Sequence, residues 1–210
     1  MACTVLALLG CPAQPAALSV TILQADGRPL TGAVVVAESK LAYPVRTNVK
    51  AIMDQRDLMF VPEVLLIRTG TAVEFPNSDQ VRHQVYSFSG AKTFQLPLYA
   101  GKTQPPVVFD RAGIVTVGCN IHDAMIAYIF VTDSPWHGRS NDKGTLQLAD
   151  LAAGNYLVKI WHPRMNEGRQ LIEQAVTLSD NADGSVKIQL RKALRGAVHH
   201  HTTGKQWQDY

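Results

Sequence analysis

Short runs of β-branched and aromatic residues, separated by turn sequences, constrain the fold of this chain more than any other feature. Asp26-Gly27 and Thr69-Gly70 are typical turn pairs between such runs. Apolar and polar residues alternate clearly at 145–148 and 186–190, and no long window has a helical period. This pattern predicts an all-β chain built from sandwiches. The predicted strands are 18–23, 33–38, 64–67, 72–75, 107–110, 114–118, 127–132, 146–148, 156–161 and 186–190.

Length and charge narrow the possible functions. The 210 residues suffice for one large β domain or two small ones. The formal net charge is only +3, and Lys and Arg are scattered along the chain. A nucleic-acid partner would require a much stronger basic surface, so we expect none.

The N-terminal segment reads as an export signal. The first charged residue is Asp26; before it, an apolar stretch at 4–10 is followed by small residues at 13–17. We expect residues 1–17 to be a signal peptide and the protein to be periplasmic. A positive segment is missing at the start, so an apolar N-terminal strand is the alternative. Pro12 and Pro15 interrupt the run, which argues against an integral membrane span. Lipoprotein anchoring at Cys11 is the less favoured interpretation.

Cysteine usage points to a metal. The chain has Cys3, Cys11 and Cys119, and the first two fall in the expected signal. The mature chain would then hold one thiol, which cannot form an internal disulfide in an oxidising compartment. Metal ligation would explain such a thiol. A buried cysteine acting as a small hydrophobe is the alternative.

The segment 118–125, GCNIHDAM, gives that thiol partners. It places Cys119, His122 and Met125 at C-x2-H-x2-M spacing. One thiolate, two imidazoles and a weak axial thioether make a blue-copper site, and His83 is the best candidate for the remaining imidazole. Structural zinc prefers four Cys and His ligands, and an iron–sulfur cluster needs more cysteines. Each residue alone would be read as packing, but three together in one turn favour ligation.

The region 57–133 resembles the cupredoxin family, with the ligand spacing of its amicyanin members, a kind of protein associated with methylamine utilisation. The segment 59–70 resembles the entry strand and hairpin of the family, 73–77 the strand leading to the first ligand, and 113–119 the strand that delivers the thiolate. The resemblance implies a Greek-key β-sandwich and one type-1 copper ion. The ligands that it implies are His83, Cys119, His122 and Met125.

The resemblance also implies a surface through which electrons enter and leave the site. At one position the sequence departs from the pattern of the family. In the family, the His between Cys and Met reaches the surface, so redox partners are expected to dock near His122. Many cupredoxins place Asn directly after the first His to brace the Cys loop. Here that residue is Gln84, and Asn77 or Asn120 would have to do the bracing.

The flanks look like a second module. Segments 20–35 and 142–158 resemble the opening and closing hairpins of a carboxypeptidase-regulatory-like β-sandwich. We therefore expect a discontinuous sandwich over 18–44 and 138–192, with a cupredoxin domain at 45–137 inserted within it. One elaborated cupredoxin with extra edge strands is the alternative. Residues 134–143 are a candidate linker, and 193–210, including His199–His201, a flexible tail.

Three functions remain open at this point. The first is a periplasmic redox carrier with one copper ion, acting in electron transfer. The second is copper delivery or storage, and the third is a metal-free adhesive or ligand-binding β protein. No second His cluster, Ser-His-Asp set or carboxylate pair stands out, so we do not expect an enzyme.

Overall fold

The structure is a computed structural model that describes residues 16–40, 42–44, 47–101, 104–165, 171–180 and 182–196. The described residues form seventeen strands and no helix, which confirms the predicted all-β class. Accordingly, they include no helix long and apolar enough to cross a membrane. Most of the expected signal (1–15), with Cys3 and Cys11, and the tail from 197 onward, with His199–His201, lie outside the described residues.

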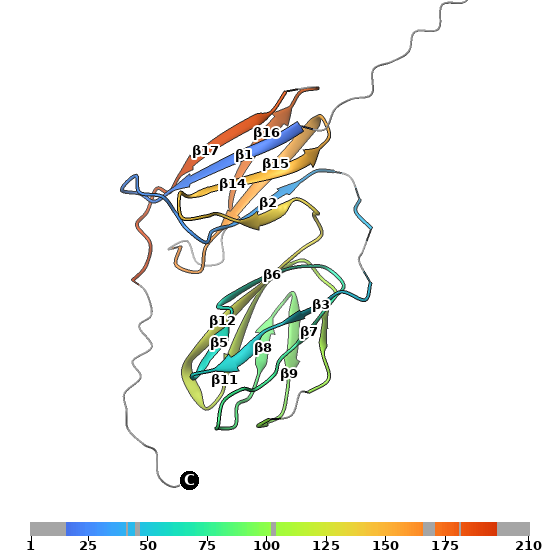
Figure 1. Cartoon of the computed structure of the whole chain (residues 1–210), viewed down its shortest axis with the longest axis vertical. Coiled ribbons are helices and arrows are strands. Elements are labelled where there is room, and N and C mark those ends of the chain that lie inside the picture. The colour runs from blue at the N-terminus through green and yellow to red at the C-terminus, as the bar shows by residue number, and fades with distance from the viewer. Residues whose placement is uncertain are drawn as a thin grey trace, which may run out of the picture.

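Two β-sandwiches lie one above the other (Figure 1). The upper one, here called the outer sandwich, packs the sheet β14-β1-β17 against the sheet β13-β2-β15-β16. β1 pairs antiparallel with β14 and parallel with β17, so the first and last strands are neighbours. The strands are β1 (Ala16–Leu23), β2 (Val34–Glu38), β13 (His137–Arg139), β14 (Thr145–Leu151), β15 (Gly154–Trp161), β16 (Ile172–Leu178) and β17 (Gly184–Gln189).

The lower one, here called the inner sandwich, has the sheets β6-β12-β11-β8-β9 and β10-β7-β3, with the hairpin β4-β5 beside them. Its connections cross between the sheets, as in Greek-key sandwiches. The strands are β3 (Lys50–Ile52), β4 (Asp54–Arg56), β5 (Met59–Val61), β6 (Val64–Arg68), β7 (Thr71–Glu74), β8 (Tyr86–Ser89), β9 (Lys92–Gln95), β10 (Val107–Phe109), β11 (Gly113–Cys119) and β12 (His122–Thr132).

A small apolar cluster joins the two sandwiches. β2 is buried on both faces, because Val35 packs into the outer core while Val34 and Val36 face the inner sandwich. There they meet Phe130 of β12 and Trp161 of β15, which is 2 % exposed. The ring of Trp161 lies edge-on to that of Tyr128, with the ring centroids 5.2 Å apart.

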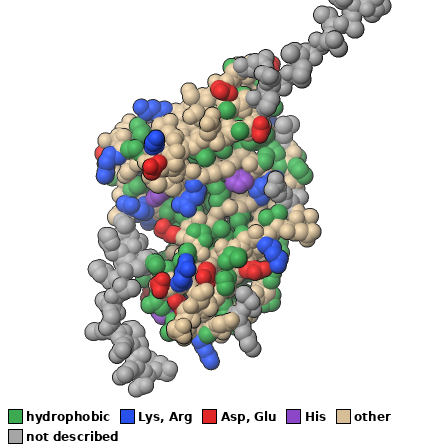
Figure 2. Space-filling model, viewed as in Figure 1, with side chains coloured by type: hydrophobic (Ala, Val, Ile, Leu, Met, Phe, Trp, Pro, Cys, Tyr) green, Lys and Arg blue, Asp and Glu red, His purple; other side chains and the backbone are tan. Residues whose placement is uncertain are grey.

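The chain leaves the outer sandwich and returns to it at one place. Ala37, the penultimate residue of β2, donates its N–H to the carbonyl of Trp136 at 2.9 Å. The hydroxyl of Ser134 donates to the carbonyl of Ala37 at 2.5 Å. The inner sandwich is therefore held between two adjacent points of the outer one. On the face in Figure 2, acidic and basic side chains are interspersed over both sandwiches.

Three segments that the sequence assigns to a linker, a signal peptide and a tail contain structured residues. The candidate linker 134–143 contains β13, which exists because it pairs with β2 and not because of its own His-Gly-Arg sequence. β1 begins at Ala16, so the last residues of the expected signal belong to a strand. In the expected tail, Arg195 is hydrogen-bonded to Arg164 and Pro163.

Candidate metal centre

His83 is held in a closely hydrogen-bonded stretch between β7 and β8. Its backbone pairs with that of Tyr99 through two hydrogen bonds of 3.0 Å. The side chain is fully buried. A polar ring at such a position must find partners, because an unpaired buried polar group is costly.

Cys119 and His122 come from one tight turn. Cys119 ends β11, His122 begins β12, and the two residues face each other across the hairpin. The β-branched run of β11 and the apolar run of β12 make long, well-paired strands, so this turn is anchored on both sides. Cys119 is 2 % exposed, whereas His122 is half-buried.

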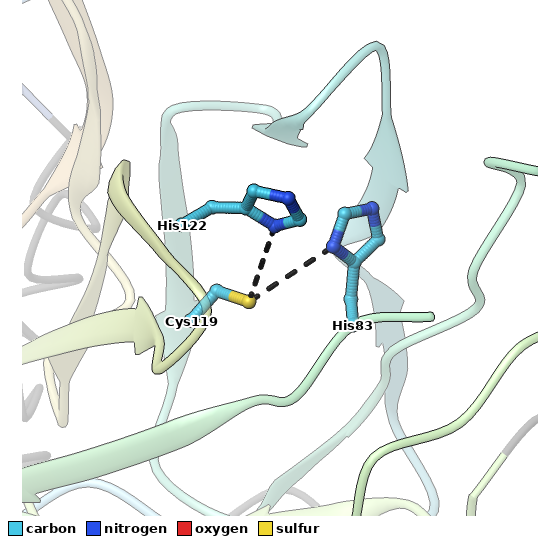
Figure 3. Close-up of side chains that lie close together, drawn as sticks. All are labelled: His83, Cys119 and His122. Atoms are coloured by element: carbon cyan, nitrogen blue, oxygen red, sulfur yellow. Dashed lines mark hydrogen bonds between the residues drawn. The ribbon is translucent and has the colours of Figure 1, made fainter. Parts of the chain in front are cut away.

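The three side chains converge (Figure 3). The Sγ of Cys119 lies 3.9 Å from Nδ1 of His83 and 3.8 Å from Nδ1 of His122. The three candidate ligand atoms all lie within 4.8 Å of one another. Bonds from zinc are about 2.3 Å long to sulfur and about 2.0–2.1 Å long to nitrogen, and serve as a guide. With these lengths, a sulfur and a nitrogen bound to one ion lie about 3.8 Å apart if the angle at the metal is 120°, and about 3.6 Å apart at the tetrahedral angle. The observed separations are close to both values, so the three ligand atoms lie near enough to one another to bind a single metal ion.

Met125, the fourth residue predicted from the sequence, lies on the buried side of β12. It is 1 % exposed and belongs to the same core cluster as Cys119. Thiolate, imidazole and thioether are soft or borderline donors, so the set as a whole fits copper. The role of Met125 as the weak axial ligand stays a prediction.

Asp79 is a site residue that the sequence analysis missed. Its carboxylate oxygen lies 2.7 Å from Nε2 of His83, on the side of the ring away from Cys119. The same carboxylate accepts the backbone N–H groups of Asp57 at 2.6 Å and Leu58 at 3.0 Å. Metal-binding histidines commonly donate their second N–H to a carboxylate, which fixes ring orientation and tautomer. An acidic residue four positions before the candidate His was the available signal.

The environment of Asp79 favours its charged form. Burial by itself would raise the pKa of this carboxyl, but the hydrogen bonds from His83, Leu58 and Asp57 outweigh burial and leave the pKa below its ordinary value. The ionised carboxylate can accept a hydrogen bond from the Nε2–H of His83, and in that neutral tautomer Nδ1 presents a lone pair toward Cys119.

Asn77 braces the His83 segment and not the Cys turn. Its Nδ2 donates to the carbonyls of Val81 and Tyr99, both at 2.9 Å, and its Oδ1 accepts the N–H of Asp79. Beneath it, the Tyr99 hydroxyl donates to the carbonyl of Phe75 and accepts from Gln55. Burial raises the pKa of Tyr99 to about 12. This neutral network positions the loop that carries Asp79 and His83.

The half-buried His122 forms the solvent side of the cluster. Burial, and then the neighbouring His83, lower the pKa of His122, which favours the neutral imidazole that can bind a metal. Four exposed apolar side chains, here called the apolar rim, belong to segments that touch the site. They are Leu58 beside Asp79, Val81 in the Asn77 loop, Leu98 next to Tyr99, and Ile121 next to His122.

The other histidines within the described residues do not join the cluster. Nδ1 of His137 lies 2.8 Å from the carbonyl of Ser134, and His162 accepts the N–H of Arg164. Both belong to the outer sandwich.

No family model matches the chain, and no curated protein matches it. Among solved structures, a reduced amicyanin variant is similar at 17% identity and a TM-score of 0.37, over 46% of this chain and 97% of that one. Amicyanin from Paracoccus versutus is similar at 16% identity and a TM-score of 0.36, over 46% and 96%. A purple cupredoxin from Nitrosopumilus maritimus is similar at 23% identity and a TM-score of 0.34, over 40% and 100%.

Proposed function

We propose that this protein is a periplasmic mononuclear type-1 copper protein that acts in electron transfer. The observation that carries the proposal is the position of the Cys119 sulfur, 3.8 and 3.9 Å from the nearest nitrogens of two imidazoles. When bound, copper would supply one-electron chemistry between its two common oxidation states. His83, Cys119, His122 and Met125 would hold the ion, and Met125, as the weakest donor of the four, would tune its potential.

The rigidity of the pocket supports electron transfer over copper delivery. Two of the three clustered residues are almost completely buried, and Cys119 and His122 stand at the ends of paired strands. His83 is held at its backbone by Tyr99 and at its ring by Asp79. A pocket that changes little between oxidation states favours fast electron exchange, whereas delivery requires ligands that open easily.

The apolar rim supports docking of a redox partner near His122. Ile121 is 52 % exposed and Leu98 is 47 % exposed. Exposed apolar side chains on the segments that hold the site, with Ile121 next to the half-buried His122, suit a small, transient interface. The physiological donor and acceptor would be redox proteins that present a complementary apolar patch.

An optical and EPR spectrum of the copper-loaded protein tests the proposal. We expect an intense thiolate-to-copper band, a reversible one-electron reduction, and loss of the band in Cys119→Ser. Met125→Leu keeps the side-chain volume and should raise the potential, because it removes a donor to the oxidised ion. Met165→Leu, a buried methionine of the outer sandwich, is the matched control. Rapid loss of copper to a chelator, without reversible reduction, would favour delivery instead.

Periplasmic export needs its own test. Cell fractionation and N-terminal sequencing of the secreted chain should show removal of residues close to 1–17. A full-length chain in the cytosol would contradict this part of the proposal and would leave the metal chemistry untouched.

A further inference from the structure

A cleft of about 690 Å³ lies between the two sandwiches. Small-molecule sites commonly have volumes of about 300–1,000 Å³ and often occur where domains meet. The wall from the inner sandwich includes Met59, Ile126 and Tyr128, and the wall from the outer sandwich includes His162, Arg164 and Arg195. One wall is thus largely apolar and the other is basic.

The two arginines are held in place by backbone carbonyls. Nε of Arg164 donates to the carbonyl of Arg195, and Nη2 of Arg195 donates to the carbonyl of Pro163, each at 2.8 Å. A guanidinium has five N–H donors, so most of them remain for a ligand. Within the described residues neither arginine forms an ion pair, and Glu63 is the one acidic residue that lines the cleft.

His162 adds a neutral donor to the basic wall. Its Nδ1 accepts the backbone N–H of Arg164 at 3.2 Å, so the proton of the neutral ring sits on Nε2. Burial, and then Arg164 and Arg139, lower the pKa of His162 to about 4. The ring is therefore uncharged at neutral pH. Anions are recognised well by such a combination of guanidinium and N–H donors.

The opposite wall would accommodate an apolar body. Ile126 is 45 % exposed and Met59 is 36 % exposed, although both are large apolar residues. We propose that this cleft binds a small organic carboxylate with an aromatic ring, the carboxylate on Arg164 and Arg195 and the ring against Met59, Ile126 and Tyr128. The proposal is independent of the metal chemistry, because none of these residues is a candidate metal ligand.

Calorimetric titration of the full chain with naphthalene-2-carboxylate tests the proposal. We expect the carboxylate to bind about 10-fold or more tightly than the neutral naphthalene-2-carboxamide, the effect of one hydrogen bond to a charged group. Acetate, which lacks the ring, should bind at least about 10-fold more weakly than the naphthoate. Equal affinity for the carboxylate and the carboxamide, or no binding at millimolar concentration, would overturn the proposal.

Two variants localise the binding. Arg164→Met should weaken naphthoate binding by about 10-fold or more, whereas Arg111→Met, an exposed arginine on the inner sandwich, should leave it unchanged. Because Arg164 also holds the C-terminal segment, Ile126→Glu provides a second variant at an exposed position. Ile126→Glu places a negative charge in the cleft and should weaken naphthoate binding as much as Arg164→Met does. Unchanged affinity in both variants would show that the probe binds elsewhere.

Discussion

At the scale of single residues, the contact of the Asp79 carboxylate with Nε2 of His83 leaves Nδ1 as the nitrogen that faces the sulfur of Cys119. This 2.7 Å contact orients a ring that is buried from solvent. We expect Asp79→Asn to lower copper affinity about 10–100-fold, because the charged acceptor that fixes ring and tautomer is lost. Competition with a chelator measures the change.

Asp123→Asn is the matched control for this prediction. Asp123 is also an acidic residue close to a candidate ligand, but it is exposed and follows His122 in the chain. The Asp123→Asn variant should bind copper with the same affinity as the parent protein. If both variants lost copper affinity to the same extent, the loss in Asp79→Asn would result from removing a negative charge and not from losing the contact with His83.

Because His162 is buried in its neutral form, we expect the protein to lose stability in weak acid. Its pKa is lowered to about 4 in the folded protein, against about 6.5 in an unfolded chain. The unfolded state therefore binds the proton first, and the stability that is present above pH 6.5 is lost as pH falls toward 4. The loss should be about 1–3 kcal/mol after allowance for solvent screening.

Urea unfolding at several pH values measures this effect, with His162→Asn as the comparison. The amide oxygen of Asn can replace Nδ1 as acceptor for Arg164, so the fold should persist. The variant should be less sensitive to pH between 4 and 6.5. An identical pH dependence in the two proteins would contradict the assignment to His162.

At the scale of elements, the turn before β14 depends on a glycine. Gly144 has a φ of 70°, and a Cβ there would collide with the carbonyl of Ile22 and crowd the backbone of Leu30. Gly27 has a similar φ of 85°, with nothing within 4 Å of an added Cβ. We expect Gly27→Ala to cost about 1–2 kcal/mol from backbone strain alone.

Gly144→Ala should cost more, about 2–5 kcal/mol, because the collision adds to the strain. The N–H of Ile22 donates to the carbonyl of Gly144, so a shifted turn would also disturb β1. Urea unfolding of the two variants separates the contributions. Equal losses would mean that the turn moves aside without resistance.

Elements were predictable from the sequence where they carry their own signal. β1 and β11 contain apolar alternation or β-branched runs and were predicted to within two residues at each end. For β12 the prediction covered the apolar part, 127–132, and missed its first five residues. β13 and β9 were missed, because they are short and polar and become strands only by pairing with a neighbour. The same reasoning applies to the site: the local C-x2-H-x2-M turn could be read, whereas Asp79 and the cleft depend on how distant segments meet.

At the scale of the whole molecule, Trp161 couples the two sandwiches. It is 2 % exposed and contacts the rings of Tyr128 and Phe130. Trp161→Ala should destabilise the protein by about 3–5 kcal/mol. We further expect the two sandwiches to unfold separately in this variant, because the cluster that joins them loses its largest member.

Denaturant unfolding followed by two probes checks this expectation. In the copper-loaded protein, the proposed thiolate-to-copper band would report the inner sandwich, and far-ultraviolet circular dichroism reports both sandwiches. The two transitions should coincide in the parent and diverge in Trp161→Ala, while Trp161→Phe, which retains an aromatic ring, should remain close to the parent. Coincident transitions in all three proteins would show that the coupling lies elsewhere.

The pairing of β1 with β14 and β17 also sets an order in time. A ribosome releases β1 and β2 long before the strands that complete their sheets, whereas the inner sandwich is finished once β12 has been made. During synthesis the inner sandwich can therefore fold while β1 and β2 still lack partners. β2 lacks both of its partners until β13 and β15 have been made, and one edge of β1 stays unpaired until β17 has been made. In that interval unpaired strand edges expose the protein most to aggregation.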